Sequence, residues 1–581
     1  MKPAKSWAFA TLWGVTAAMP ALLIPAFGNG YTEPKLVALW GLGAVCGAVM
    51  IARLARGQTV YMTPFSRVAS ALLLLQLIGC WGVANWGLAF QSMALTAAAV
   101  SICMLVANSQ IDEASLSSAV VPGTLVVVVG LLARIVFGKV LFSDYSPFGA
   151  TLGLKNSVSV YLALVLPFVL LLVHASRAVR ASSVRFAVQG ALCTLLAIMV
   201  WVILANRTRS AWWMLLVYGA TTGLAAWRWR RPEVIRLCWV LLGSYAVGAL
   251  LLNGVPDSLR WRSETPYWES LSTLASLDRA SGRKELWTVG LRMFSQYPVF
   301  GVGTGAYPAV WREFIAQTTV NPKAFAFLRG DLPIFNDYLQ GAVESGFLAG
   351  LAGFGARAAL PLYYFYRLTR SKGDFSVAVF LMCLATLGLA ADAFFDSPFG
   401  RPETVLLFAV AMGLVERQRR GSHSIVLAKR WNAVLIPVTL GLVSLTAVMT
   451  TGLALRSASR RPTDPALLAR AVGLWPWDIQ WSHQYLNILL LGGQPVAAEQ
   501  LVKLRLRAWP TDPESHYMRG ILLEHQGQLL EAVQSLERSV LRVAGGVCYA
   551  PGYNAYVSAL ERLGGTIHIE PLPDAVLSAC R

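Results

Sequence analysis

The stretch SVSVYLALVLPFVLLLVHA, from Ser157 to Ala175, decides the fold class of this chain. It is apolar almost throughout, and roughly 20 such residues rising 1.5 Å each cross the ~30 Å hydrocarbon core of a bilayer. Similar runs recur from Trp7 to Leu455. From the number of these runs, we expect about thirteen transmembrane helices. The sequence therefore predicts an all-α, polytopic membrane helical bundle.

The expected helices are named by the apolar runs that define them. In chain order they are Trp7–Phe27, Leu36–Ile51, Val68–Val83, Leu88–Ala107, Ala119–Phe137, Ser157–Ala175, Val184–Ala205, Ala211–Trp227, Val234–Asn253, Tyr338–Tyr363, Phe375–Phe394, Thr404–Val415 and Ala433–Leu455. The first run is too long for the apolar region of a signal peptide and lacks a clear cleavage site, so we expect it to be the first helix.

Composition and charge support a membrane protein and give it an orientation. The chain is 56% hydrophobic and 14% charged, whereas soluble domains carry about 25% charge. The net charge of +19 does not indicate nucleic acid, because the basic residues gather in short loops on one side, as the positive-inside rule requires. We expect the N-terminus on the cytoplasmic side. An odd number of helices then places the C-terminal part on the opposite side, which for a bacterial inner membrane is the periplasm.

The C-terminal part, residues 456–581, is polar, helical and repetitive. The motif LWPWD at Leu474–Asp478 recurs as AWPTD at Ala508–Asp512, 34 residues later. This is the tetratricopeptide spacing. We therefore expect two domains, a membrane domain over 1–455 with a large periplasmic loop at 254–335, and a tetratricopeptide-like periplasmic domain over 456–581. An oxidising compartment would permit a disulfide between Cys548 and Cys580.

Four segments on the expected outer face place polar or glycine-rich clusters at a membrane edge. They are Gly149–Asn156, Asn206–Trp213, Gly282–Tyr307 and Phe335–Gly350. Taken in this order, with the long loop between the second and fourth, the segments resemble those of the O-antigen ligase and polymerase superfamily of bacterial envelope glycosyltransferases.

The resemblance implies a metal-independent transferase that takes a glycan from an undecaprenyl pyrophosphate carrier. The acceptor would be a glycan or a protein, and no cofactor is expected. Arginine suits such a donor because its guanidinium binds phosphate bidentately and stays protonated. The candidate pyrophosphate ligands are Arg209, Arg207, Arg283, Lys155 and Asn336. The alternative for a basic residue at an outer helix end is snorkelling to lipid headgroups, and for Arg209 the functional role is favoured.

The sequence departs from the family at the general base. Many members have a histidine where this chain has Phe335, so the candidate bases are the nearby acids Asp337, Asp331 and Glu344. The alternative for Asp337 is a carboxylate favoured by a helix dipole. The glycines at 301, 303 and 305 form either a phosphate-cradling turn or, more commonly, a tight structural turn.

The predicted function is therefore glycan transfer, with a polysaccharide or O-antigen polymerase favoured. A repeat domain presents surfaces to protein partners, which favours an enzyme that works with envelope machinery. O-antigen ligase and protein O-oligosaccharyltransferase remain alternatives within the family. A lipid-linked glycan transporter and a non-catalytic membrane scaffold are alternatives of other classes, although the membrane half shows none of the repeats typical of transporters. No cluster has metal-ligand spacing.

Overall fold

The computed structural model describes residues 3–23, 32–137, 150–253, 283–315, 333–370, 376–418, 425–459, 465–541 and 550–563. These residues are almost entirely helical, and the one sheet among them pairs the two-residue strands β1 (Tyr61–Met62) and β2 (Ile425–Val426) antiparallel. The all-α prediction is confirmed. The chain divides into two compact units, Met1–Leu73 with Ala94–Leu274 and Ala352–Ala447, and Leu74–Met93 with Ala275–Leu351 and Val448–Arg581.

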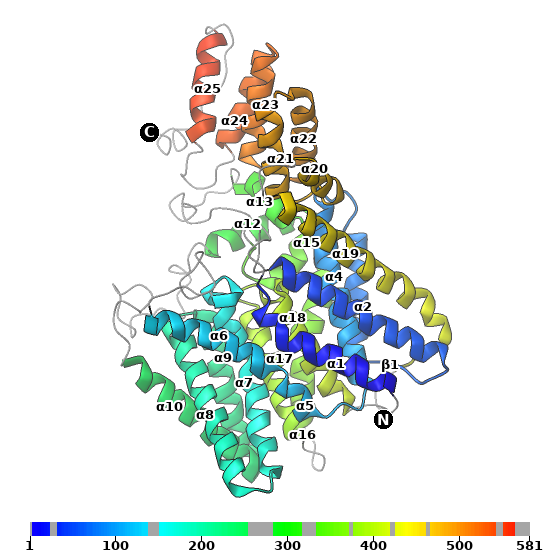
Figure 1. Cartoon of the computed structure of the whole chain (residues 1–581), viewed down its shortest axis with the longest axis vertical. Helices are drawn as coiled ribbons and strands as arrows, with labels where there is room; N and C mark the ends of the chain where they lie inside the picture. The colour runs from blue at the N-terminus through cyan, green and yellow to red at the C-terminus, as the bar shows by residue number, and fades with distance from the viewer. Residues whose placement is uncertain are drawn as a thin grey trace. The chain divides into compact units, whose positions relative to one another are not determined.

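The first unit is a bundle of apolar helices. They are α1 (Pro3–Ala18), α2 (Glu33–Ala55), α5 (Glu113–Ser118), α6 (Val120–Phe137), α7 (Lys155–Ala175), α8 (Ser182–Ala205), α9 (Arg209–Trp229), α10 (Pro232–Asn253), α16 (Leu360–Arg370), α17 (Val377–Asp392) and α18 (Pro402–Arg417). Helix α7 packs against α8, α9 and α17 and is buried over most of its length, as expected for a helix that is apolar all round. Helices α7, α8 and α10 lie in adjacent positions in the bundle (Figure 1).

Each of the thirteen apolar runs contains a helix, and seven helices in the described part are long and apolar enough to cross a membrane. The candidate spans are Glu33–Ala55, Trp86–Ala107, Glu113–Ala133, Lys155–Ala178, Ser182–Ala205, Pro232–Leu252 and Asn432–Leu455. Four helices have residues in both units, α3 (Pro64–Ile78), α4 (Trp86–Ala107), α15 (Asp337–Phe354) and α19 (Asn432–Ser459).

The tenth run is interrupted, and α15 is not among the candidate spans. Gly346 has φ 85° and ψ 175° inside α15, and a π-helical turn at Gly355–Ala359 separates α15 from α16. A side chain at Gly346 would collide with the backbone of Val299. The break therefore lies where the loop after α12 (Arg283–Gln296) crosses the helix, and only glycine tolerates both the conformation and the contact.

The second unit contains α12, α13 (Tyr307–Ile315) and six short C-terminal helices. These six are α20 (Pro465–Leu474), α21 (Ile479–Leu491), α22 (Pro495–Ala508), α23 (Pro513–His525), α24 (Leu529–Leu541) and α25 (Ala550–Leu563). Helices α23 and α24 begin 34 residues after α21 and α22. The sequence repeat therefore corresponds to a repeated pair of helices, while its assignment to the tetratricopeptide class stays a prediction.

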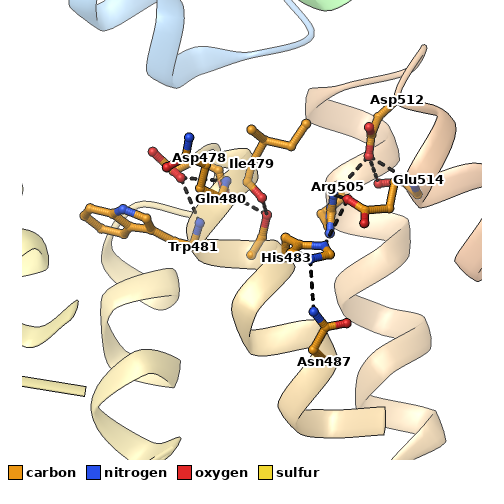
Figure 2. A network of polar contacts seen from close by, with 11 residues as sticks. Asp478, Ile479, Gln480, Trp481, His483, Asn487, Arg505, Asp512 and Glu514 are labelled. Carbon is orange, nitrogen blue, oxygen red and sulfur yellow. Dashed lines mark hydrogen bonds and ion pairs between the residues drawn. The ribbon is translucent and has the colours of Figure 1, made fainter. Parts of the chain in front are cut away.

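Equivalent aspartates begin the repeated helices. The Asp478 carboxylate accepts the backbone N–H groups of Gln480 and Trp481, and the Asp512 carboxylate accepts that of Ser515. These are N-caps, which satisfy helix donors that have no partner within the helix. Figure 2 shows both aspartates in one polar network. Cys548 and Cys580, and with them the expected disulfide, lie outside the described residues.

Candidate functional site

The first and second predicted segments meet in the first unit. The Lys155 ammonium donates to the carbonyl oxygen of Asn206 (3.2 Å), and the Asn206 side-chain amide donates to the Ser159 hydroxyl (3.1 Å). The Thr208 hydroxyl donates to the Asn156 side-chain oxygen (3.3 Å). The turn between α8 and α9 is thus bound to the first turns of α7, and Lys155 is brought to the same place as the turn that carries the two arginines.

Two of the predicted basic ligands occupy the same kind of position. Lys155 and Arg209 are the first residues of α7 and α9, which follow the N-cap residues Leu154 and Thr208. A helix N-terminus carries partial positive charge and exposes unpaired N–H groups, so it opposes a cation and favours an anion. Basic side chains here do not stabilise their helices. Together with the N–H groups they make two positions suited to a phosphate or pyrophosphate.

Backbone strain gathers in the predicted segments. Among the described residues, the non-glycine residues with positive φ are Ala150, Arg207, Arg230 and Phe335. Three of them belong to the first, second and fourth segments, and Arg230 lies at the end of α9. Such conformations cost about 1–3 kcal/mol each and persist where the surroundings enforce them, often at functional sites. This distribution supports the choice of segments without assigning a role to any side chain.

Helix α12 brings the third segment onto the fourth in the second unit. The Arg283 guanidinium lies over the Phe335 ring at 5.4 Å, and the Trp287 indole N–H donates to the carbonyl oxygen of Ile334 (3.1 Å). Leu286, Val289 and Met293 of α12 are buried against α13 and Ile334, and Trp287 packs against the same cluster. Residues four apart share a helix face, and here both contact the turn that begins α15.

Asn336 and Asp337 begin α15. The Asn336 side-chain oxygen accepts the N–H groups of Tyr338 (3.1 Å) and Leu339 (2.9 Å), so it is an N-cap. Only its amide nitrogen is suited to a phosphate oxygen. Asp337 is buried and is the first residue of the helix. That position suits a carboxylate for dipole reasons and also holds it beside Phe335, at the place where relatives often have histidine.

The glycine-rich loop from Gly301 to Tyr307 uses its N–H groups on the protein itself. The carboxyl of Glu344 accepts those of Gly305 and Tyr307. The N–H groups of the other five loop residues donate to the carbonyl oxygens of Tyr297, Val343, Glu344, Gly79 and Gly303. Since every N–H group of this loop has a partner, the loop is a structural turn rather than a phosphate cradle.

Glu344 is the anion that this loop binds. The Gln340 amide donates to its carboxyl (2.9 Å), while the Gln340 oxygen accepts the Ile334 N–H (3.2 Å). A carboxylate can act as a general base, but this one is committed to holding the loop and the start of α13.

Two contacts were missed by reasoning from sequence. Lys35 is buried, and its ammonium donates to the carbonyl oxygen of Thr151 (2.7 Å), which anchors the first segment. Lys35 lies in the first turn of α2, on the side of the membrane expected to be poor in basic residues, and that was the available signal. Gln340 lies within the fourth segment, and no role was predicted for it. Arg401 pairs with the buried Asp396 at 2.9 Å.

The described candidates form two groups, one in each unit. Lys155, Arg207 and Arg209 belong to the first, and the second contains Arg283, Asn336, Asp337 and Glu344. Asp331 lies outside the described residues, as does most of the loop at 254–335. No group of three or more potential metal ligands was found in the described ranges. The expectation that the protein needs no metal stays a prediction.

Residues 194–354 match the family model described as O-Antigen ligase. A search of the curated proteins finds no match to the chain. The matched stretch contains both arginines of the second segment and all the described candidates of the third and fourth, while Lys155 precedes it. The match supports the O-antigen ligase and polymerase superfamily and, with it, a membrane enzyme that transfers glycan.

Proposed function

From its O-antigen ligase domain, we propose that this chain is a polysaccharide or O-antigen polymerase. It takes a glycan from an undecaprenyl pyrophosphate donor at the periplasmic face of the inner membrane and joins it to an acceptor glycan. The observation that carries the proposal is the presence of Lys155 and Arg209 at the N-termini of α7 and α9, which contact each other through Asn206 and Thr208.

The N-terminal positions favour pyrophosphate binding over snorkelling. A basic side chain that only reaches toward lipid headgroups gains nothing from a helix N-terminus, where the dipole opposes its charge by about 0.3–1 kcal/mol. A bound pyrophosphate reverses the sign of that interaction. It also gains charge-assisted hydrogen bonds from the guanidinium group of Arg209 and the ammonium of Lys155.

The reaction is a displacement at the anomeric carbon of the donor sugar. The acceptor hydroxyl oxygen forms a bond to that carbon while the bond from the carbon to the phosphate oxygen breaks. The electron pair leaves with the lipid pyrophosphate, whose growing negative charge the basic residues stabilise. The hydroxyl proton passes to a carboxylate.

Asp337 is the proposed base. It begins α15 beside Phe335, whereas the carboxyl of Glu344 is bound to Gln340 and to the loop before α13. Asp331 remains a second candidate. In this scheme Arg207 and the Asn336 amide nitrogen contribute further contacts to the pyrophosphate, and neither a metal nor a cofactor is required.

The repeated C-terminal helices favour polymerisation over a single transfer. Helix repeats present surfaces to protein partners, and a polymerase depends on chain-length or export machinery in the envelope. A periplasmic protein partner is therefore part of the proposal. An O-antigen ligase or a protein O-oligosaccharyltransferase would give a different product pattern with the same donor.

Arg209→Ala tests the proposal, with Arg228→Ala as its matched control at the other end of α9. In cells that make the polymer, Arg209→Ala should abolish the ladder of repeat units and leave the lipid-linked single unit, while Arg228→Ala keeps the ladder. A ladder that persists in Arg209→Ala at normal protein level would contradict the catalytic role and favour a scaffold. Transfer of single units without a ladder would favour a ligase.

A further inference from the structure

The two copies of the repeated motif both contact parts of the second unit that lie far away in sequence. The first copy contains Trp475–Asp478 and the second contains Trp509–Asp512. Each forms the turn between two helices of the C-terminal repeats. We name them the first and second docking turns. The two turns contact different elements.

The second docking turn binds α13. The Thr511 hydroxyl, which is fully buried, donates to the carbonyl oxygen of Ala309 (2.8 Å) in the first turn of that helix. Ala309 also shares an apolar cluster with Ala508 and Trp509. A buried hydroxyl bonded to a helix carbonyl fixes the distance and the rotation of the turn relative to α13.

The first docking turn binds the start of α4. The carbonyl oxygen of Trp477 accepts a hydrogen bond from the Asn85 side-chain amide (3.3 Å) and another from the Trp509 indole N–H (2.8 Å). Gly87 lies so close that an added Cβ would be 2.8 Å from the Cβ of Trp477. The same carbonyl thus joins α4 to the second docking turn.

Ion pairs drawn in Figure 2 join the helices around the second docking turn. The buried Arg505 of α22 binds the Asp512 carboxylate (3.0 Å), which caps α23, and also approaches Glu514 (3.5 Å). Glu514 in turn contacts His483 of α21 (2.9 Å). Since the helices on both sides of the second docking turn are tied together, the turn holds its shape against α13.

Helix α13 connects the second docking turn to the predicted site. Its buried Tyr307 and Trp311 pack in one cluster with Leu286 of α12 and with Ile334. The Tyr307 N–H also binds the carboxyl of Glu344. A shift of α13 would therefore move the two elements that carry Arg283 and Asp337.

We propose that the C-terminal repeats position the transfer site through these docking turns, with Thr511 and Asn85 as positioning residues. The proposal rests on the proposed function. It gives the repeats a part in the reaction of an isolated chain, independent of any partner. Removing a docking contact should slow transfer by letting α12 and the start of α15 depart from their productive arrangement, because small misplacements at a reacting centre are costly.

Thr511→Val tests this, since it keeps the shape of the side chain and removes only the hydroxyl. Ser535→Ala is the matched control, because that buried hydroxyl also donates to a backbone carbonyl (His516, 2.9 Å), but within the repeats. The assay is transfer by the purified full chain in liposomes with a lipid pyrophosphate glycan. Thr511→Val should lower kcat about two- to tenfold at unchanged donor KM, the range set by one hydrogen bond. Thr511→Ser should restore kcat, and Ser535→Ala should leave it unchanged.

Asn85→Asp provides a second test should Thr511→Val fold poorly. It keeps the oxygen that accepts the Leu88 N–H and removes the donor to Trp477, so kcat should again fall. Equal kcat losses in Thr511→Val and Ser535→Ala would show a general stability effect and overturn the inference. Unchanged kcat in both Thr511→Val and Asn85→Asp would also overturn it. Absence of transfer by the wild-type chain would instead refute the proposed function.

Discussion

Gly346→Ala is the most informative single change in the region of the site. Gly346 has φ 85° and ψ 175°, a conformation available almost only to glycine, so alanine adds about 1–3 kcal/mol of strain. Its methyl group would also collide with the Val299 backbone, which adds about 1–3 kcal/mol of overpacking. Because Val299 presents backbone there, no rotamer change relieves the contact. The sum is about 2–6 kcal/mol.

Gly346→Ala should disturb the glycine-rich loop from Gly301 to Tyr307 as well as lower the overall stability. The Phe347 N–H binds the carbonyl oxygen of Pro298, and the Gly303 N–H binds that of Glu344. Separating the loop from α15 breaks these bonds. The apparent melting temperature in detergent, at one scan rate, should fall by about 5–20 °C, and glycan transfer should be lost. Gly341→Ala is the control, since nothing lies within 4 Å of its added Cβ. Equal stability and activity in the two variants would refute the reasoning.

Two further predictions concern a hydrogen bond made by α12 and an ion pair within the C-terminal repeats. Trp287→Phe keeps an aromatic ring but removes the indole N–H that donates to the Ile334 carbonyl. The steady-state rate of glycan transfer should fall several-fold while protein yield stays normal. Unchanged kinetics would contradict a role for this bond. Burial raises the pKa of Glu514, but His483 and Arg505 outweigh it and hold the pKa below 4.5. The ionised form thus stabilises the repeats above about pH 4.5, and that stability should be lost on acidification; thermal unfolding against pH should show this loss reduced in Glu514→Gln.

Local features of the site followed from sequence because they depend on neighbours along the chain. The four-residue spacing of Arg283 and Trp287 places them on one helix face, and both contact the turn at 334–335. The apolar runs likewise predicted where helices form, since the length of an apolar run measures its fit to a bilayer. The 34-residue offset of the tryptophan motif predicted the repeated helix pairs, because segments of similar sequence form similar helices.

Contacts between segments far apart in sequence were not predictable in this way. The glycine loop pattern permits a phosphate cradle, and only the approach of Glu344 shows that its N–H groups are already used. The contact of Lys35 with Thr151 joins residues 116 positions apart. The break at Gly346 depends on a crossing loop, which no periodicity within the helix records.

The proposed base differs from the histidine that the family resemblance implies at Phe335. Phe335 has a left-handed backbone and the Arg283 guanidinium over its ring, so this position packs with Arg283. In the proposed scheme, proton transfer therefore falls to the adjacent Asp337.

The central claim is that the chain itself transfers glycan and that Arg283 stabilises the leaving pyrophosphate. It is tested most directly by initial rates of the purified protein in liposomes, comparing Arg283→Ala with Arg292→Ala on the same helix. Loss of a group that stabilises developing charge costs about a hundredfold or more in kcat. We predict that loss for Arg283→Ala and near-normal rates for Arg292→Ala. Equal rates for wild type and Arg283→Ala would contradict the account.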